Sequence, residues 1–308
     1  MRKALLLSAI ASMFLFSCKK EHSTSTPAGK KYPVTFSVTN FKSNQSSFAL
    51  RHGASSLADT VNASGAIGIL YYAVYTSGMG VHGRILKQDS SMANFGTVID
   101  SLPAGQYQVV FVGGKNGLVE TYGGRTATDN FSYGSTKWQD TFWDEFNLTI
   151  GTNGVSQNVT LARVVGKLEL DITDNIPANA DSLVITVDPE ATNIANDGGQ
   201  TSGPPSGIVT YSEKIPAGAI GQANFTMDRI IGNVEIPATV TITCKDASNA
   251  IIATTTVNNV RMHVNEKTVL SGNLFSGPPP ANSQSFTVSV DTAWSSTINQ
   301  VGFSLRHH

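Results

Sequence analysis

DSLPAGQYQVVFVGG, residues 100–114, carries the clearest fold signal of the chain. Pro103 and Gly105 stand where a turn needs them, because proline presets one backbone angle and glycine tolerates unusual ones. The run after the turn alternates between apolar and polar residues, and its apolar face consists of Tyr107, Val109 and Phe111. A period of two is typical of a strand with one buried face. The stretch therefore predicts a turn followed by a β-strand.

The same kind of signal recurs along the chain at intervals of about ten residues. Near the start, the residues that alternate are Val34, Phe36 and Val38. Residues 67–75 form a nearly continuous apolar run, as expected for a central strand covered on both faces. Further strands are expected at 158–172 with a kink near Gly166, and at 182–187, 207–212, 222–228, 238–246, 251–257, 260–275 (a hairpin) and 285–291. Short strands separated by turn signals predict antiparallel sandwiches, so the fold class is all-β.

The composition agrees with an exported β-protein. Only 14% of the 308 residues are charged, with 21 basic and 22 acidic side chains, against a usual charged fraction of about 25%. This balance leaves no basic stripe for nucleic acid. Beyond Cys18 the only cysteine is Cys244, which lies in an apolar run. We expect Cys244 to be a buried strand residue that forms no internal disulfide.

The N-terminus predicts a membrane anchor. Arg2 and Lys3 precede an apolar run, residues 4–16, that is too short to span a bilayer. The run ends in Leu15-Phe16-Ser17-Cys18, which resembles a bacterial lipobox. In proteins with this pattern the cysteine sulfur receives a diacylglyceryl group, the peptide is cut before it, and the new amine is acylated. Several acyl chains hold a protein on a membrane durably. The alternative is an ordinary secretory signal with an incidental cysteine.

We therefore assign residues 1–17 to a lipoprotein signal peptide and 18–31 to a flexible polar tether. The remaining chain is long enough for two domains that each bury a core. We expect an N-terminal β-sandwich over 32–155 and a C-terminal β-sandwich over 156–308, with the interdomain turn at 151–157.

An aromatic patch, residues 137–146, has the spacing of a helix. Trp138, Phe142 and Phe146 recur every fourth residue, with Trp143 beside them. One interpretation is a short helix or turn that caps a sandwich. The other is an exposed platform for glycans made of Trp138, Phe142 and Trp143. A long loop at 188–207 is a second place where a ligand is expected.

The sequence contains no GxSxG, HExxH, Walker-loop or CxxC motif of catalytic or redox sites. The histidines are scattered, which argues against a zinc site. Asp171 with Asp174, or Asp140 with Asp144 and Glu145, offer oxygens to calcium, but they lack the spacing of a calcium loop and are expected to be solvated or capping. We predict a non-enzyme with no catalytic or metal site and no cofactor beyond the lipid. Carboxylates paired only in space remain an open alternative.

Several segments, taken in order, resemble the fimbrillin superfamily of type V pili from Bacteroidetes, in its lipoprotein branch of FimB-type anchor and accessory subunits. The matching segments are the lipobox that ends at Cys18, the strand 34–38, the turn and strands of 95–107, the run 140–143 leading through 148–150 into 159–168, and the strand 267–275. The resemblance implies two tandem transthyretin-like antiparallel β-sandwiches of Greek-key type.

The resemblance also implies assembly by donor-strand exchange, in which a strand of one subunit fills a groove of another. The candidate anchors in the strand 285–291 are Phe286, Val288 and Val290, and the prolines 278–280 would detach that strand from its own sheet. An ordinary last strand is the alternative. The arginines in loop-like context, Arg51 and Arg84, do not match the cleavage site of the family's shaft subunits.

The resulting hypothesis is a fimbrial anchor or accessory subunit for cell adhesion. It would be held by diacylglyceryl and palmitate chains on the outer membrane, on the outer surface, with other fimbrial subunits and a host or glycan ligand as partners. The alternative is a surface lipoprotein that binds glycans through loops and aromatic residues. An orientation toward the periplasm also stays open.

Overall fold

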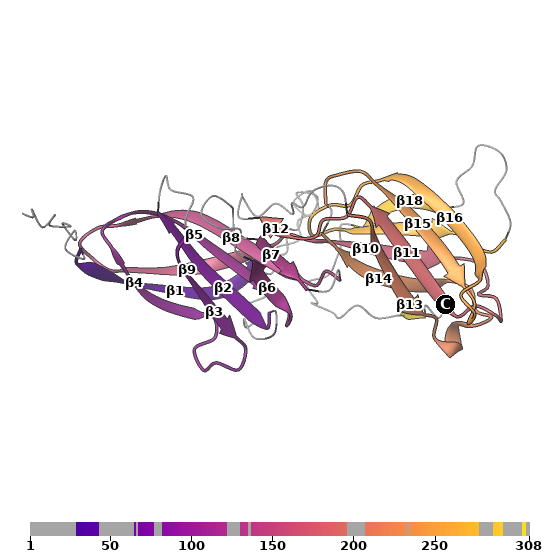
Figure 1. Ribbon diagram of the computed structural model, residues 1–308, viewed down its shortest axis with the longest axis horizontal. Helices are drawn as coiled ribbons and strands as arrows, with labels where there is room; N and C mark the ends of the chain where they lie inside the picture. The colour runs from indigo at the N-terminus through magenta and orange to yellow at the C-terminus, as the bar shows by residue number, and fades with distance from the viewer. Residues whose placement is uncertain are drawn as a thin grey trace, which may run out of the picture. The chain divides into compact units, whose positions relative to one another are not determined.

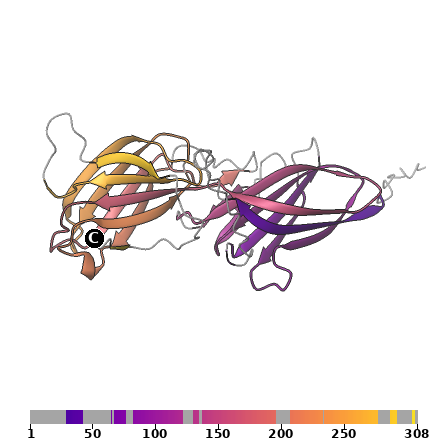
Figure 2. The same cartoon turned by 180° about the vertical axis from the view of Figure 1, so that it is seen from behind.

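The computed structural model describes residues 29–42, 65, 67–76, 82–121, 130–134, 137–195, 207–232, 234–276, 286–291 and 304–305. Cys18 and the signal peptide lie outside these residues. The described part consists of β-strands with one short 3₁₀ turn, η2 (Ala217–Ala219), which confirms the all-β fold class. Figures 1 and 2 show the early strands, from β1 to β9, in one set and the strands from β10 to β18 in another, except β12, which lies beside β7. In the described residues no helix has the length and apolar character needed to cross a membrane.

The first set forms a seven-stranded sheet that folds over a buried core. In order along the sheet, its strands are β3 (His82–Asp89), β2 (Ile69–Thr76), β5 (Gly105–Gly114), β8 (Thr141–Ile150), β9 (Val155–Arg163), β1 (Lys31–Lys42) and β4 (Thr97–Pro103). Strands β8 and β9 pair only through Phe142 with Arg163 and Trp143 with Ala162. Side chains from both sides of this joint share one buried cluster, so the sheet makes two layers. The cluster is aromatic, with Phe36, Tyr72 and Phe111 at its centre.

The stretch 100–114 turns the chain from one layer to the other. Strand β4 reaches Pro103 and β5 begins at Gly105, so the turn is shorter than expected. Strand β4 pairs with β1, whereas β5 pairs with β2 and β8. The Tyr107 hydroxyl donates a hydrogen bond of 2.9 Å to the Pro103 carbonyl oxygen, which closes the corner.

The second set makes two facing sheets. One contains, in order, β18 (Phe286–Asp291), β17 (Lys267–Gly272), β10 (Gly166–Ile172), β14 (Phe225–Ile231) and β19 (Ser304–Leu305). The other contains β13 (Val209–Lys214), β11 (Ser182–Asp188), β15 (Ala238–Lys245) and β16 (Ile251–Val260). A small third sheet, β12 (Ile194–Ala195), β7 (Asn130–Tyr133) and β6 (Leu118–Thr121), includes strands from both parts of the sequence.

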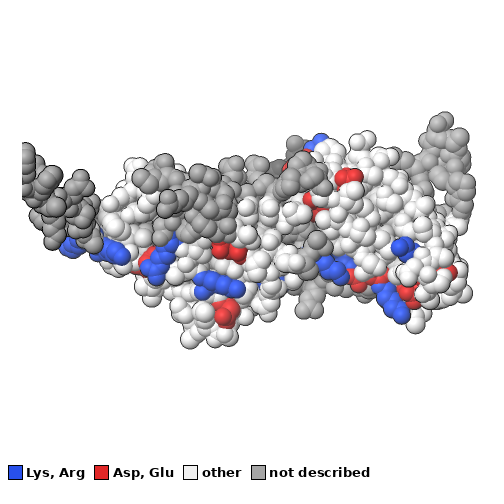
Figure 3. Space-filling model, viewed as in Figure 1, with Lys and Arg blue, Asp and Glu red and all other residues white. Residues whose placement is uncertain are grey.

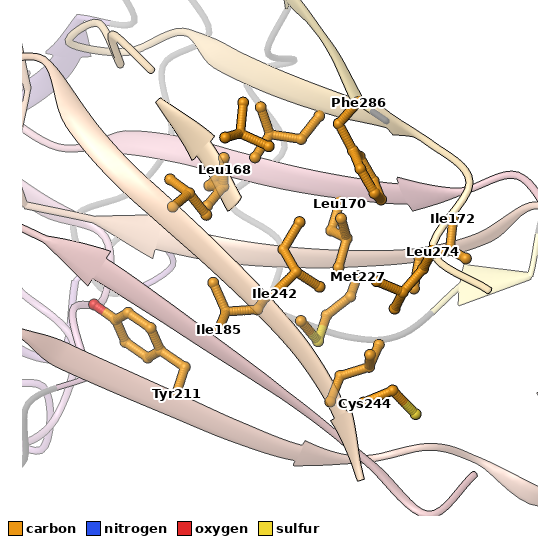
Figure 4. Packing of buried hydrophobic residues seen from close by; sticks show 14 of the residues in the cluster. Leu168, Leu170, Ile172, Ile185, Tyr211, Met227, Ile242, Cys244, Leu274 and Phe286 are labelled. Atoms are coloured by element: carbon orange, nitrogen blue, oxygen red, sulfur yellow. The ribbon is translucent and has the colours of Figure 1, made fainter. Parts of the chain in front are cut away.

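A mainly aliphatic core lies between the two larger sheets of the second set (Figure 4). Leu168, Leu170 and Ile172 from β10 meet Ile185 from β11 and Ile242 from β15. The prediction for Cys244 is confirmed, because it is fully buried in β15. Burial, and then the charge of Asp181, raise the pKa of the Cys244 thiol to about 11. A thiol in this state is a packing residue and a poor nucleophile.

Two expectations about pairing and boundaries are corrected. The β1–β9 and β10–β17 pairs are parallel, so the sandwiches are not purely antiparallel. The expected long strand 158–172 is two strands, β9 and β10, in different sheets. Residues 151–154 connect β8 to β9 within the first sheet, and the chain leaves that sheet at Val164 and Val165. The division into domains at residue 155 is thus not matched by the strand pairing, since β9 belongs with β1.

Candidate functional site

Strand β18, the predicted docking strand, ends the five-stranded sheet. It pairs antiparallel with β17, with Gly272 opposite Phe286, Leu270 opposite Val288 and Thr268 opposite Val290. Within the described residues β18 has no neighbour on its other side. The outer backbone groups of Phe286 to Val290 therefore pair with no strand of the described residues, an arrangement that can accept a further strand.

The three predicted anchors lie on the face of β18 that points toward the core, but they are buried unequally. Phe286 is 1% exposed and packs into the aliphatic core, as Figure 4 shows. Val288 and Val290 are 41% and 44% exposed, although Leu270 and Thr268 beside them are buried. The opposite sheet thus covers Phe286 but stops before Val288 and Val290. These two branched apolar side chains are left partly exposed at the edge of the sheet.

One charged cluster holds the far end of β18. The Lys267 ammonium lies 3.1 Å from a Glu169 oxygen and 3.2 Å from an Asp291 oxygen. Burial alone would lower the pKa of Lys267, but hydrogen bonds from Lys267 to Glu169 and Asp291, together with their charges, raise it above its ordinary value. Asp291 is the only charged residue of β18. The rest of the strand, Thr287 to Val290, carries no charge that would repel a partner.

The exit from β17 is fixed by one carboxylate. Asp174 accepts hydrogen bonds from the backbone N–H groups of Leu274, Phe275 and Ser276, at 3.0, 2.7 and 2.8 Å. The Ser276 hydroxyl donates to it as well. Asp174 therefore works as a cap. The prolines 278–280 and the rest of the connection to β18 lie outside the described residues.

The other candidate calcium ligands also have structural partners. Asp171 accepts a hydrogen bond from Ser271, Asp140 pairs with Arg163, and Glu145 accepts from Gln108. Among the described residues, no group of three or more His, Cys, Asp or Glu side chains is placed to hold a metal ion.

The aromatic patch 137–146 is an irregular segment up to residue 140 and a strand from Thr141 on, so the helix predicted there is wrong. Strand β8 covers Thr141–Ile150. Trp138, Phe142 and Trp143 are 6%, 2% and 5% exposed, so these rings do not form an open platform in this fold. Phe142 packs in the aromatic core and Trp143 in a second cluster on the other face of the sheet. Most of the loop 188–207, the second expected ligand site, lies outside the described residues.

Trp138 has a role that the sequence did not reveal. Its indole N–H donates a 2.6 Å hydrogen bond to the Ala191 carbonyl oxygen, and the ring lies against Gly232, where a Cβ atom would be 2.2 Å from the ring. Nearby, β12 pairs with β7. The residue thus joins parts of the chain from the first and second sets of strands.

A buried ion pair makes a second connection of this kind. Arg163, 2% exposed, binds both carboxylate oxygens of Asp140 at 2.7 and 3.2 Å and donates to the Asn265 side-chain oxygen at 2.6 Å. Asn265 stands in the turn before β17 at a φ of 58°. Bidentate contacts of this type fix geometry as well as charge. Arg163 was not singled out from the sequence, because nothing in the pattern 155–163 distinguishes a buried arginine from an exposed one.

Solved structures with a similar fold come from Bacteroidetes. A candidate polysaccharide-binding protein of Bacteroides thetaiotaomicron matches with TM-score 0.53 and 12% identity, over 79% of this chain and 92% of that one. A candidate adhesin of Bacteroides ovatus matches with TM-score 0.50 and 11% identity, over 83% and 95% of the two chains. The fimbrial anchor protein Mfa2 of Porphyromonas gingivalis matches with TM-score 0.49 and 10% identity, over 85% and 98%.

This similarity shows that the chain shares its fold with these solved Bacteroides structures. Identities this low establish a common fold alone. Among curated proteins, none matches the sequence. A family model does match: the one described as a family of unknown function (DUF6562) covers residues 125–304, more than half of the chain. The chain belongs to this family of unknown function, DUF6562.

Proposed function

We propose that this protein is a non-enzymatic subunit of a fimbrial or adhesin assembly, anchored in the outer membrane by a lipid on Cys18. It needs no cofactor beyond its acyl chains, and its partners are other subunits that dock through β18. Support comes from the lipobox and from the segments that resemble the fimbrillin superfamily and follow one another in the same order. It also comes from a fold that is shared with a candidate adhesin of Bacteroides.

The observation that carries this proposal is the apolar outer edge of β18 at Phe286 to Val290, beside which the described residues place no further strand. A strand whose outer backbone groups are unpaired serves as a template for another strand. Main-chain hydrogen bonds then give affinity, and alternate side chains give specificity. Val288 and Val290 supply apolar side chains that an added strand would cover.

Docking takes place with β18 in its own sheet. Removing the strand would expose Phe286, and losing a buried phenylalanine from a core costs about 3–5 kcal/mol. Adding a strand at the free edge requires no such loss. The donor-strand role expected from the sequence stays a prediction. It differs from edge docking because β18 would have to leave its own sheet.

A cross-strand disulfide separates the two modes. Leu270→Cys with Val288→Cys, which lie opposite each other in the β17–β18 pair, would lock β18 in place. Under edge docking, the locked protein still enters the high-mass fimbrial fraction of the cell envelope. Under donor exchange, it enters that fraction only after reduction. Val269→Cys with Ser289→Cys is a matched pair on the opposite face.

A lysine at the edge tests whether β18 is used at all. Val288→Lys places a charge on a 41%-exposed position, where it blocks strand addition with little cost to folding. The protein should then remain outside the assembled fraction. Ile99→Lys, at a 67%-exposed position of β4, is the matched control and should assemble normally. Equal assembly of both variants would refute docking at β18.

The anchor is tested separately. Mass spectrometry of the mature N-terminal peptide should show Cys18 as the first residue with diacylglyceryl and acyl additions. Cys18→Ala should move the protein from the membrane to the soluble fraction. An unmodified Cys18 in a membrane-free protein would refute the lipid anchor and leave the β18 proposal standing.

A further inference from the structure

The outer face of the four-stranded sheet β13-β11-β15-β16 is a regular array of hydroxyl groups. On each strand alternate residues enter the core, among them Ile185, Tyr211, Ile242 and Val257. The residues between them point outward. The strand registers place one outward row across the whole sheet, and this row consists of Thr210, Thr186, Thr241 and Thr256. We call it the threonine row.

A second row lies next to the first and is also uncharged. It consists of Ser212, Val184, Thr243 and Thr254, again one residue from each strand. Thr239 and Asn258 extend the pattern on β15 and β16, with a hydrogen bond of 3.3 Å between their side chains. The face is therefore a small lattice of side chains. Its spacing is about 4.8 Å across strands and about 6.8 Å along them.

Hydrogen bonds hold neighbouring hydroxyls of this lattice in place. Within the threonine row, Thr186 and Thr210 are 3.2 Å apart, and Thr241 and Thr256 are 3.3 Å apart. In the second row, Thr243 and Thr254 are 3.0 Å apart. A hydroxyl has one hydrogen and two lone pairs, so each keeps bonding capacity toward solvent. Threonine is also stiff about its first side-chain bond. The face thus presents fixed hydroxyl and methyl groups.

The charge on this face excludes several classes of ligand. Neither row contains a charged residue, and the charged outward positions, Asp188, Lys214 and Lys245, lie at the strand ends. The two lysines stand in one row at a single end of the face, so an anionic polymer would find no cations along the two central rows. On the side of the molecule that Figure 3 shows, most of the described surface is uncharged and the charged side chains gather mainly along the lower border of the view. An apolar protein face is disfavoured too, because it would bury hydroxyl groups without replacing their bonds to water.

We propose that this face binds an uncharged polysaccharide. Such a chain carries hydroxyl groups and C–H groups in alternation and no charge, and it complements a neutral face of hydroxyls and methyls. Aromatic stacking is not required, and the rings in the sequence's aromatic patch are buried elsewhere. The inference does not rest on docking at β18, which belongs to the other sheet.

Affinity electrophoresis of the full chain tests this proposal. The native gels contain dextran, xylan or mannan as neutral probes, and alginate or heparin as charged ones. At least one neutral polymer should retard the wild-type protein. Thr186→Val with Thr241→Val removes two central hydroxyls, keeps the branched shape that strands favour, and should weaken that retardation at least about fivefold. Thr287→Val, on β18 of the other sheet, is the matched control and should bind like wild type.

Three outcomes would overturn the proposal. The first is no retardation by any neutral polymer, and the second is equal binding by the double variant and the wild type. The third is self-association of the wild type that the double variant loses, which would assign the face to a second copy of the chain. Circular dichroism of the double variant confirms that it is folded.

Discussion

Strands β4 and β18 each end a sheet, but they end it in opposite ways. The core-facing residues of β4 are Val98, Asp100 and Leu102, all buried, and Pro103 closes the strand. The middle one is a carboxylate that pairs with Arg84 at 2.7 Å. Inward charges and prolines are devices by which natural edge strands avoid adding further strands. Strand β18 has neither within Phe286 to Val290.

The difference shows that β4 carries protective features of an edge strand that β18 lacks. On β4, the core-facing side chains are buried along the whole strand, and the inward charge of Asp100 disfavours pairing with an added strand. On β18, Phe286 is the last core-facing side chain that is buried, and Val288 and Val290 remain 41% and 44% exposed. Substitutions on the two strands, and a change of pH, test this contrast.

Phe286→Ala should have the largest effect. Phe286 is the one residue of β18 that is fully buried, so its truncation should lower the free energy of unfolding by about 3–5 kcal/mol. Val290→Ala on the same strand should cost much less, because Val290 is half exposed. Urea denaturation of both variants measures the contrast. A loss below about 1 kcal/mol for Phe286→Ala would show that β18 is not anchored as described.

The sequence could predict such strands wherever one face is buried. Alternation identified Tyr107, Val109 and Phe111 in β5, and the apolar run around Cys244 identified β15. These predictions held because a period of two directly reports which side chains face a core. The exposure of Val288 and Val290 was not predictable, since Phe286, Val288 and Val290 form the same alternating apolar pattern in the sequence. Their difference arises from where the opposite sheet stops.

The aromatic patch failed for a physical reason. A spacing of four fits one face of a helix, but it also fits one face of a strand, because four is twice the strand period. Phe142 and Phe146 therefore share a face of β8, and Trp143 faces the other way. Two buried faces remove the polar alternation that would have indicated a strand. The contacts of Arg163 with Asp140 and Asn265 were hidden as well, because they join residues up to 102 positions apart.

Asp100→Leu, on β4, should have the second-largest effect on stability. The Asp100 side chain is 1% exposed and accepts hydrogen bonds from Arg84 and from the Tyr72 hydroxyl at 3.4 Å. Its loss leaves the buried hydroxyl unpaired, so the free energy of unfolding should fall by about 1–3 kcal/mol. The strand would also lose its inward charge, and self-association should appear in size-exclusion chromatography. Asp100→Asn keeps an acceptor and should show a smaller loss; equal losses would contradict this role.

Alkaline pH should weaken the fold through Tyr72, which lies under β4. Burial, followed by the charge and hydrogen bond of Asp100, raises the pKa of Tyr72 well above its ordinary value of 10.0. Below that value both folded and unfolded chains keep the proton, so the stability is fully present. Above it the unfolded chain loses the proton first, and stability should fall by up to about 1.4 kcal/mol per pH unit for this tyrosine.

Urea titrations between about pH 9 and pH 11 measure this slope. Tyr133 and Tyr211, whose pKa values burial also raises, add to it. Tyr72→Phe should remove the contribution of one titrating phenol to the slope of the unfolding free energy against pH. The contributions of Tyr133 and Tyr211 should remain. An unchanged slope in this variant would mean that Tyr72 is not buried as a neutral phenol.

Asp291→Asn should have the smallest effect, and it should be local to β18. Asp291 is 44% exposed and pairs with Lys267 at 3.2 Å, so its loss should cost only about 0.2–1 kcal/mol. The pKa of Lys267 is raised by its two carboxylates, so their stabilisation is present below the ordinary value of 10.5 and is lost as pH rises through the raised pKa. Because β17 is the one strand of the described residues that pairs with β18, amide exchange should quicken in 287–291 and stay unchanged in β4. Asp181→Asn, which removes the exposed partner of Lys214, is the matched control and should leave exchange in β18 as it is. Faster exchange throughout the molecule would show that this ion pair supports the whole fold, and the contrast between a closed β4 edge and a loosely held β18 edge would then fail.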